Sequence, residues 1–149
     1  MTTAARQGVP TQLGHVALRV RDVDRAVQFY RDVLGLEVKS YTPRAAFLGI
    51  RPDASHELAL FPLGDKADGP DPRRVGMYHS AWEMASFADL EQLHQRLLAH
   101  NTQIAGYNDR GWNVMFLDPD GNELEAIWEP SAEERAEQPG GAPLPRLSH

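Results

Sequence analysis

Two histidines and one glutamate stand at positions where metal chemistry is expected. His15 lies seven residues before Asp22, a residue suited to cap a helix, and His79 lies seven residues before Ser86, which is equally suited. Glu125 follows the turn sequence DPDG and sits in the middle of an apolar, strand-like stretch. Two neutral imidazoles and one carboxylate bind first-row divalent ions and leave coordination positions open for a substrate.

Side-chain alternation along the predicted strands places these residues on polar faces. In the stretch LGHVALRV (13–20), aliphatic residues alternate with His15, so the imidazole points away from the apolar face. In the last strand, Glu125 shares its face with Glu123 and Ile127. The chain contains no cysteine, so thiolate sites are excluded and a structural zinc site is not expected.

The elements that position these residues form the same pattern twice. A strand, a capped helix and three further strands are predicted over residues 12–63 and again over 75–129, with a turn-rich linker at 64–74. The expected fold class is α+β, with two tandem βαβββ modules in one domain. Residues 1–11 are expected to be a flexible lead-in, and residues 130–149 a C-terminal tail. The predicted strands cover residues 13–20, 37–41, 45–50, 56–61, 76–84, 103–107, 113–117 and 123–128.

Composition excludes several classes of function. The 149 residues carry a net charge of −6, and the basic residues are scattered, so a nucleic-acid-binding surface is not expected. The longest apolar runs are too short to cross a membrane, and the first residues lack the apolar core of a signal peptide. The sequence therefore predicts a cytoplasmic protein that acts on a small molecule.

The two ends of the repeated region resemble the vicinal oxygen chelate superfamily, which includes glyoxalase I, methylmalonyl-CoA epimerase, drug-resistance proteins and type I extradiol dioxygenases. The similar stretches are HVALRVRDVDRAVQFYRDVLGLE (15–37) and FLDPDGNELEAIWE (116–129), and the resemblance covers residues 12–129. It implies an open, eight-stranded cup around one divalent metal, with His15, His79 and Glu125 as its ligands. Fe(II) is the favoured ion, with Mn(II), Ni(II) or Zn(II) as alternatives, and a homodimer is the expected assembly.

The branch of the superfamily depends on a fourth ligand. Glyoxalase-like and epimerase-like members carry Glu or Gln in the last strand of the first module, where alignment of LALFPLG (58–64) places Leu58. Glu57 is adjacent but faces the other way in this alignment. A three-ligand site resembles the extradiol dioxygenases, so a catechol-cleaving dioxygenase is the leading hypothesis. The alternatives are a glyoxalase- or epimerase-like lyase or isomerase, and a non-enzymatic protein that sequesters a small molecule.

The second module departs from the dioxygenase pattern. Dioxygenases of this type carry an acid–base histidine and a tyrosine before the last strand, but here the stretch 106–121 has no histidine and Met115 takes the tyrosine position. His56 is the remaining candidate for proton transfer. The candidate substrate-side residues are Arg110, Trp112 and Tyr107.

Other aromatic and imidazole side chains are assigned to structural roles. Trp82 and Trp128 alternate with the candidate ligands and are therefore expected in the core. His94 and His100 lie in the second predicted helix without an evident partner, and both are expected to face solvent.

Overall fold

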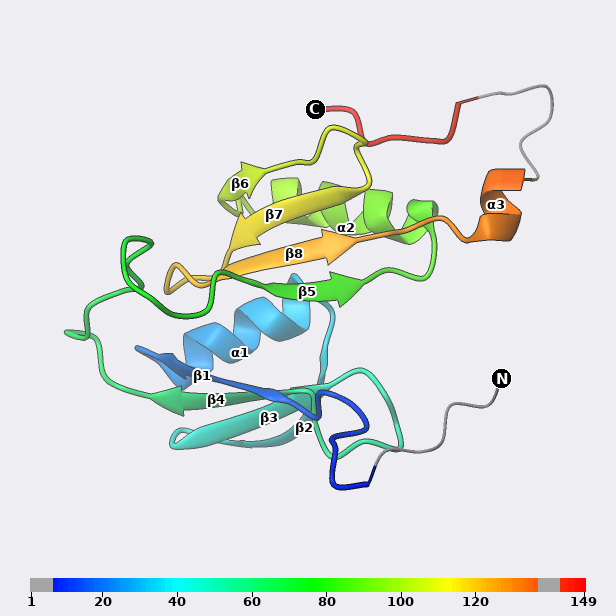
Figure 1. Cartoon of the computed structure of the whole chain (residues 1–149). Helices are drawn as coiled ribbons and strands as arrows, with labels where there is room; N and C mark the ends of the chain where they lie inside the picture. The colour runs from blue at the N-terminus through cyan, green and yellow to red at the C-terminus, as the bar shows by residue number, and fades with distance from the viewer. Residues whose placement is uncertain (1–6, 137–142) are drawn as a thin grey trace.

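The computed structural model describes residues 7–136 and 143–149, which contain two βαβββ modules in tandem (Figure 1). The predicted α+β class and the duplication are confirmed. In the first module the elements are β1 (Val16–Val20), α1 (Val23–Asp32), β2 (Glu37–Thr42), β3 (Ala45–Gly49) and β4 (Leu58–Pro62). In the second they are β5 (Ser80–Glu83), α2 (Phe87–Ala99), β6 (Ile104–Gly106), β7 (Asn113–Leu117) and β8 (Glu123–Ile127), and a short helix α3 (Ala132–Ala136) follows.

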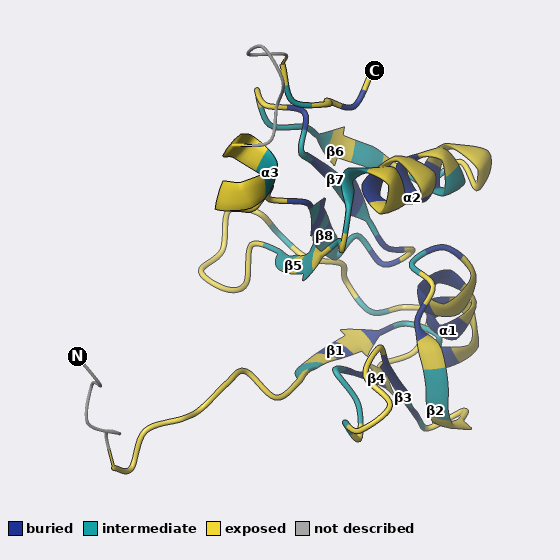
Figure 2. Cartoon of the chain, turned by 90° about the vertical axis from the view of Figure 1, so that its right-hand side faces the viewer, coloured by how far each residue is buried: buried dark blue, intermediate teal, exposed yellow. Residues whose placement is uncertain are grey.

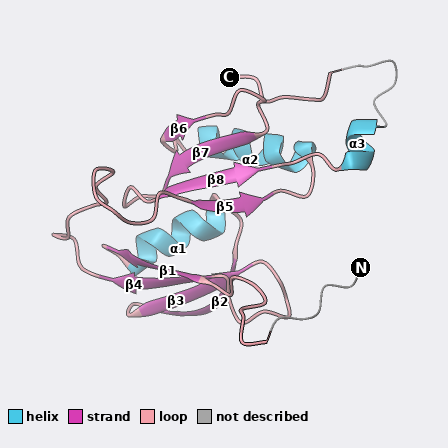
Figure 3. Ribbon diagram, viewed as in Figure 1, coloured by secondary structure: helices cyan, strands magenta, loops and turns pink. Residues whose placement is uncertain are grey.

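Each module builds its own sheet, as the described residues show (Figure 3). The strand order is β1-β4-β3-β2 in the first sheet and β5-β8-β7-β6 in the second. Within each module the first and last strands pair in parallel, and the last three strands form an antiparallel meander. In the described part of the chain, no helix combines the length and the apolar character that crossing a bilayer requires.

Helices α1 and α2 begin at the predicted caps. The Asp22 carboxylate accepts the Arg25 backbone N–H at 2.9 Å, and the Ser86 hydroxyl accepts the Asp89 backbone N–H at 3.1 Å. These bonds satisfy backbone donors that the first helical turn leaves without partners. The caps fix where each helix starts and therefore the distance from each helix to the histidine that precedes it.

The helices cover one face of each sheet and leave the other face open. In β1, Leu18 and Val20 are buried in the hydrophobic core, whereas Ala17 and Arg19, and His15 just before the strand, are exposed on the opposite face. In β8 the buried residues Leu124 and Ala126 alternate in the same way with Glu123 and Glu125, which lie on the opposite face. Figure 2 shows this division, with buried segments on the side of the helices.

Helix α1 lies between the two sheets in both views (Figures 1 and 2). It packs on β3 and β4, and its Phe29 ring lies 6.3 Å from the ring of Phe116 in β7. The Tyr30 hydroxyl donates to Asp118 Oδ2 at 2.8 Å, next to the second sheet. One hydrophobic core therefore runs through both modules, and the open faces of the two sheets lie outside it.

The C-terminal residues 143–149, named here the strap, run back along the second module. The Leu147 backbone N–H donates to the Gly111 carbonyl at 2.9 Å, and the Leu147 side chain is buried. Trp112 Nε1 donates to the Pro145 carbonyl at 3.1 Å. The strap thus holds the loop that precedes β7.

Candidate metal centre

His79 and Glu125 meet on the open face of the second sheet. His79 directly precedes β5, and the register pairs Ala81 with Glu125, so the imidazole and the carboxylate project to the same side. His79 Nε2 lies 3.0 Å from Glu125 Oε2. Two atoms that bind one ion at about 2.1 Å and at right angles lie about 3 Å apart, so this pair fits two ligands of a first-row ion.

Asn113 orients the Glu125 carboxylate. Asn113 is buried at the start of β7, and its Nδ2 donates to Glu125 Oε1 at 2.7 Å. Its own Oδ1 accepts the Asn108 backbone N–H at 2.5 Å, which fixes the amide. One carboxylate oxygen therefore faces Asn113 and the other faces His79. Asn113 was not predicted as a functional residue, although strand alternation beside Met115 places it on the face that carries Glu125.

A second carboxylate lies on the other side of the His79 ring. Glu123 Oε2 is 3.4 Å from His79 Nδ1, and both atoms are buried with no hydrogen-bond partner among the described residues. Side-chain alternation in β8 predicted Glu123 on this face, but no role was predicted for it. The imidazole thus stands between two carboxylates.

His15 and His56 lie together on the open face of the first sheet. Their ring centroids are 4.6 Å apart, and the His56 ring also packs edge-on against Phe47 at 4.9 Å. The Ser55 hydroxyl lies 3.0 Å from His56 Nδ1. The structure therefore brings the candidate proton-transfer residue beside the first candidate ligand.

The three candidate ligands do not converge within a single chain. Among residues 7–136 and 143–149, no group of three or more His, Cys, Asp or Glu side chains is gathered closely enough to hold a metal ion. His15 belongs to the first sheet, whereas His79 and Glu125 belong to the second. The cause is the position of α1, which fills the space between the sheets and keeps their open faces apart.

The structure corrects the alignment of the fourth-ligand position. Leu58 pairs with Val16 in β1 and is buried in the core, so it faces away from His15. Glu57, one residue earlier, lies on the His15 side. The prediction that Leu58 occupies the fourth-ligand position was therefore wrong, because a shift of one residue exchanges the two faces of a strand.

Glu57 is held by the adjacent hairpin. Its Oε2 accepts the Ile50 backbone N–H at 2.7 Å, and its Oε1 lies 3.1 Å from Arg51 Nε. Burial acts to raise the pKa of Glu57, but the hydrogen bonds from Ile50 and Arg51 outweigh it and lower the pKa below its ordinary value. Glu57 is therefore a carboxylate at neutral pH.

The candidate substrate-side residues of the second module lie away from Glu125. By alternation Trp112 faces opposite to Asn113, and its ring packs edge-on against buried Trp128 at 5.9 Å. The Arg110 guanidinium lies over the Trp112 ring at 5.3 Å. Trp82 packs against the core, and Trp128 is part of it, as predicted.

Tyr107, which is half-buried, contacts the buried His94. The Tyr107 hydroxyl lies 2.9 Å from His94 Nε2, and the Tyr107 ring stacks on His149 of the strap at 4.0 Å. The expectation that His94 faces solvent was wrong, because Tyr107 supplies a polar partner beneath α2; His100 is exposed as expected. Burial, followed by the charge of His149, lowers the pKa of His94.

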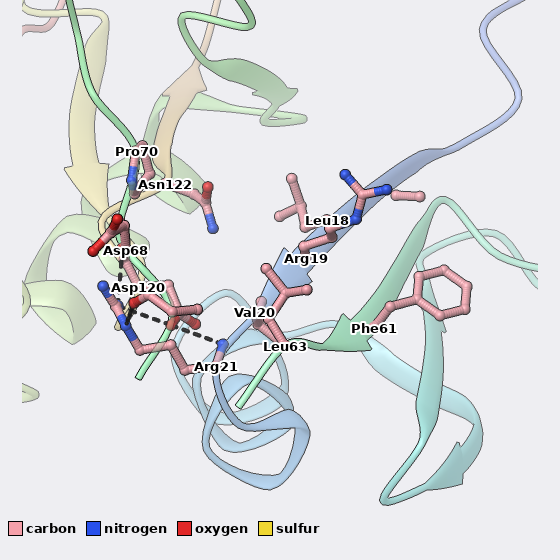
Figure 4. A pocket seen from close by; sticks show the side chains of 13 residues that line it. Leu18, Arg19, Val20, Arg21, Phe61, Leu63, Asp68, Pro70, Asp120 and Asn122 are labelled. Atoms are coloured by element: carbon pink, nitrogen blue, oxygen red, sulfur yellow. Dashed lines mark hydrogen bonds and ion pairs between the residues drawn. The ribbon is translucent and has the colours of Figure 1, made fainter. Parts of the chain in front are cut away.

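A cavity of about 670 Å³ lies where the two modules meet (Figure 4). It is bounded by β1, the linker and the DPDG turn, and Arg21 on its wall forms an ion pair with Asp120 at 3.1 Å. None of His15, His79 and Glu125 lines it. The cavity is therefore a feature of the junction between the modules rather than of the metal centre.

Residues 12–126 match the Glyoxalase/Bleomycin resistance protein/Dioxygenase superfamily. The chain is 32% identical over 120 residues to a catechol-2,3-dioxygenase of Bacillus subtilis (77% of this chain, 40% of the relative). It is 29% identical over 120 residues to biphenyl-2,3-diol 1,2-dioxygenase 3 of Rhodococcus globerulus (78% and 63%). The chain thus spans less than two thirds of the length of either dioxygenase.

The similarity extends to proteins with other activities. Mouse mitochondrial methylmalonyl-CoA epimerase is 32% identical over 124 residues (72% of this chain, 66% of the relative). A solved structure of lactoylglutathione lyase from Agrobacterium tumefaciens superposes with a TM-score of 0.61 at 27% identity (80% of this chain, 94% of that chain). Similarity alone therefore does not select one reaction.

Proposed function

Because the chain belongs to the Glyoxalase/Bleomycin resistance protein/Dioxygenase superfamily, we propose that it is a metal-dependent enzyme acting on a small substrate with two adjacent oxygens. The observation that carries the proposal is the His79–Glu125 pair at 3.0 Å, with Asn113 fixing the carboxylate from behind. A preoriented imidazole and carboxylate on an open sheet face are two of the three ligands of a two-histidine, one-carboxylate site.

A second copy of the chain supplies the third ligand. His15 of one copy joins His79 and Glu125 of its partner when the open face of one first module lies beside the open face of the other second module. A twofold axis that makes one such contact makes two, which gives a homodimer with two identical sites. Within the described residues β1 and β5 are each paired on one side only, so their free edges are available at this contact.

The donor set suits Fe(II) first, and Mn(II), Ni(II) or Zn(II) as alternatives. When bound, the ion supplies a Lewis acid that polarises the two substrate oxygens. The protein contributes orientation through Asn113, which holds one oxygen of Glu125. His56, beside His15 and next to Ser55, accepts a proton from a substrate hydroxyl.

Within this class, an extradiol-type dioxygenase that cleaves a catechol-like ring is the leading reaction. Two of the relatives named above act on diols of this kind according to their names. Three protein ligands leave open positions for a diol and for O2. In this reaction His56 takes the role that the missing histidine of the second module plays in other dioxygenases.

Proton transfer in a lyase or isomerase is the second candidate. The observation in its favour is Glu57, an ionised carboxylate on the His15 side of the first sheet. Glu57 would move a proton at the carbon next to a carbonyl, as the similarity to an epimerase also favours.

The two reactions are separated by one set of assays on protein purified without air and loaded with Fe(II). The dioxygenase predicts O2 uptake with catechols, abolished in His56→Gln and retained in the control His100→Gln, whose side chain is exposed on the far helix. The isomerase predicts deuterium exchange beside a carbonyl without O2, lost in Glu57→Gln. A wild-type protein that binds neither iron, manganese, nickel nor zinc contradicts both.

A further inference from the structure

The His79 imidazole stands between two carboxylates, and only one of them has another partner in the described chain. Glu125 Oε2 lies 3.0 Å from His79 Nε2, and its other oxygen accepts from Asn113. Glu123 Oε2 lies 3.4 Å from His79 Nδ1, and neither of these two buried atoms has a hydrogen-bond partner. The two carboxylates therefore compete unequally for the proton of the imidazole.

A neutral imidazole carries one N–H, and its position decides whether His79 can bind an ion. With the proton on Nε2, the ring donates to Glu125, and the lone pair needed by a metal is absent on that side. With the proton on Nδ1, Nε2 and Glu125 Oε2 both present lone pairs to the same space. A cation bound between them removes the repulsion of the two acceptors, and without a cation the Glu125 carboxylate moves away from the ring.

We propose that Glu123 is a positioning residue that holds the His79 proton on Nδ1 and so keeps Nε2 free for the ion. This inference rests on the proposed metal role of His79. Metal-binding histidines commonly donate their second N–H to a carboxylate, which fixes the ring and its tautomer.

Burial and register both favour this pairing. The Nδ1 of His79 and the Oε2 of Glu123 are out of contact with solvent, and a buried donor or acceptor without a partner destabilises the fold. Shortening their separation by about half an ångström gives an ordinary N–H···O bond. Glu123 pairs with Leu117 at the start of β8, two residues from Glu125, so one strand carries both carboxylates that flank the ring.

The first test is the tautomer of His79 in metal-free protein, read from 15N NMR of histidine-labelled samples at about pH 8, where a free imidazole is neutral. His79→Gln identifies the resonance. The wild type is expected to carry the proton on Nδ1, and Glu123→Ala is expected to move it to Nε2, where Glu125 accepts it. The matched control is Glu83→Ala, which removes an exposed carboxylate from the same face.

The second test is the affinity for Zn2+ and for Ni2+ alone, measured by calorimetry. Glu123→Ala is expected to weaken binding by about 10- to 100-fold, as removal of such partners does elsewhere, while Glu83→Ala leaves it unchanged. Glu123→Gln, which retains an acceptor oxygen and the shape of the side chain, is expected to recover part of the loss. It also replaces Glu123→Ala if that variant does not fold.

An unchanged His79 tautomer in Glu123→Ala overturns the inference, as does an unchanged affinity of that variant for both ions. If the wild type binds neither ion but the tautomer moves as expected, the proposed function fails while the role of Glu123 stands. The two failures are therefore distinguishable.

Discussion

At the scale of the residue, the direction of the Glu125 carboxylate depends on the Asn113 amide. Replacing Asn113 by Asp keeps the oxygen that accepts from Asn108 but turns the donor to Glu125 into a second acceptor. The two carboxylates then repel, so Asn113→Asp is expected to weaken metal binding by about 10-fold or more while the fold is retained. Calorimetry with Zn2+, together with circular dichroism, measures both; equal affinity for the variant and the wild type contradicts the role of Asn113.

His94 makes folding stability depend on pH. Its pKa is lowered in the folded protein by burial and by His149, whereas its ordinary value is 6.5. The unfolded chain therefore binds the proton first as pH falls, and the stability from neutral His94 is full above about pH 6.5 and lost on acidification. In His94→Gln the free energy of unfolding is expected to fall less between about pH 7 and pH 5 than in the wild type. Urea unfolding at each pH tests this, and parallel curves would contradict it.

Side-chain alternation predicted which faces carry His15, His79 and Glu125, because alternation is a local property of a strand. The alignment that put Leu58 rather than Glu57 at the fourth-ligand position was wrong, because the register of this strand depends on pairing with β1, a segment about forty residues earlier in the sequence. The expectation that His94 faces solvent was wrong for another reason, because its partner Tyr107 comes from the loop thirteen residues later.

At the scale of the element, the DPDG turn joins the two modules. Asp118 accepts the backbone N–H groups of Asp120 and Asn122 within the turn, and its Oδ2 accepts from the Tyr30 hydroxyl of α1. Burial first, and then the charge of Asp118, raises the pKa of Tyr30 well above its ordinary value, so the hydroxyl remains a donor. The turn that precedes the last strand thus also fixes α1 against the second sheet.

Tyr30→Phe is expected to lower the free energy of unfolding by about 1–3 kcal/mol, because it leaves a buried carboxylate oxygen with one donor fewer. The matched control is Tyr78→Phe, since Tyr78 is 72% exposed, and it is expected to have little effect. Chemical denaturation of both variants measures the difference. If the two variants unfold alike, the Tyr30–Asp118 bond does not hold the modules together.

The strap depends on a glycine at position 111. Gly111 has φ +70°, and a Cβ there would lie 2.8 Å from Arg146 Cβ, whereas Gly64 has φ +97° and nothing within 4 Å. Both Gly→Ala changes carry the backbone cost, but only Gly111→Ala displaces the strap. Gly111→Ala is expected to be more destabilising by about 1–2 kcal/mol and to speed proteolysis of the C-terminus. Equal losses in the two variants contradict the packing of the strap.

The helices and strands were predictable because helix caps, such as Asp22 and Ser86, and side-chain alternation depend only on residues close together in the sequence. The path of the strap was not, because it follows from contacts between Leu147 and a loop thirty-six residues earlier. Local sequence patterns predict helices and strands, whereas contacts between segments far apart in the sequence depend on how the core is assembled.

At the scale of the whole molecule, the duplication was visible in the sequence but the placement of the modules was not. Nothing local to α1 indicates that Phe29 and Tyr30 pack against the second module as well as the first. That packing separates His15 from His79 and Glu125, and it is the reason that a complete site is proposed between two copies rather than within one.

Mixing two inactive variants tests this assembly most directly. His15→Ala and Glu125→Ala are unfolded together, refolded, and assayed for Zn2+ binding beside each variant alone. If the site forms between copies, half of the dimers are mixed and each mixed dimer has one intact site of two, so about one quarter of the wild-type sites return. If the mixture binds no more Zn2+ than the separate variants, or if a wild-type monomer binds the ion with full affinity, the site is not shared between two copies.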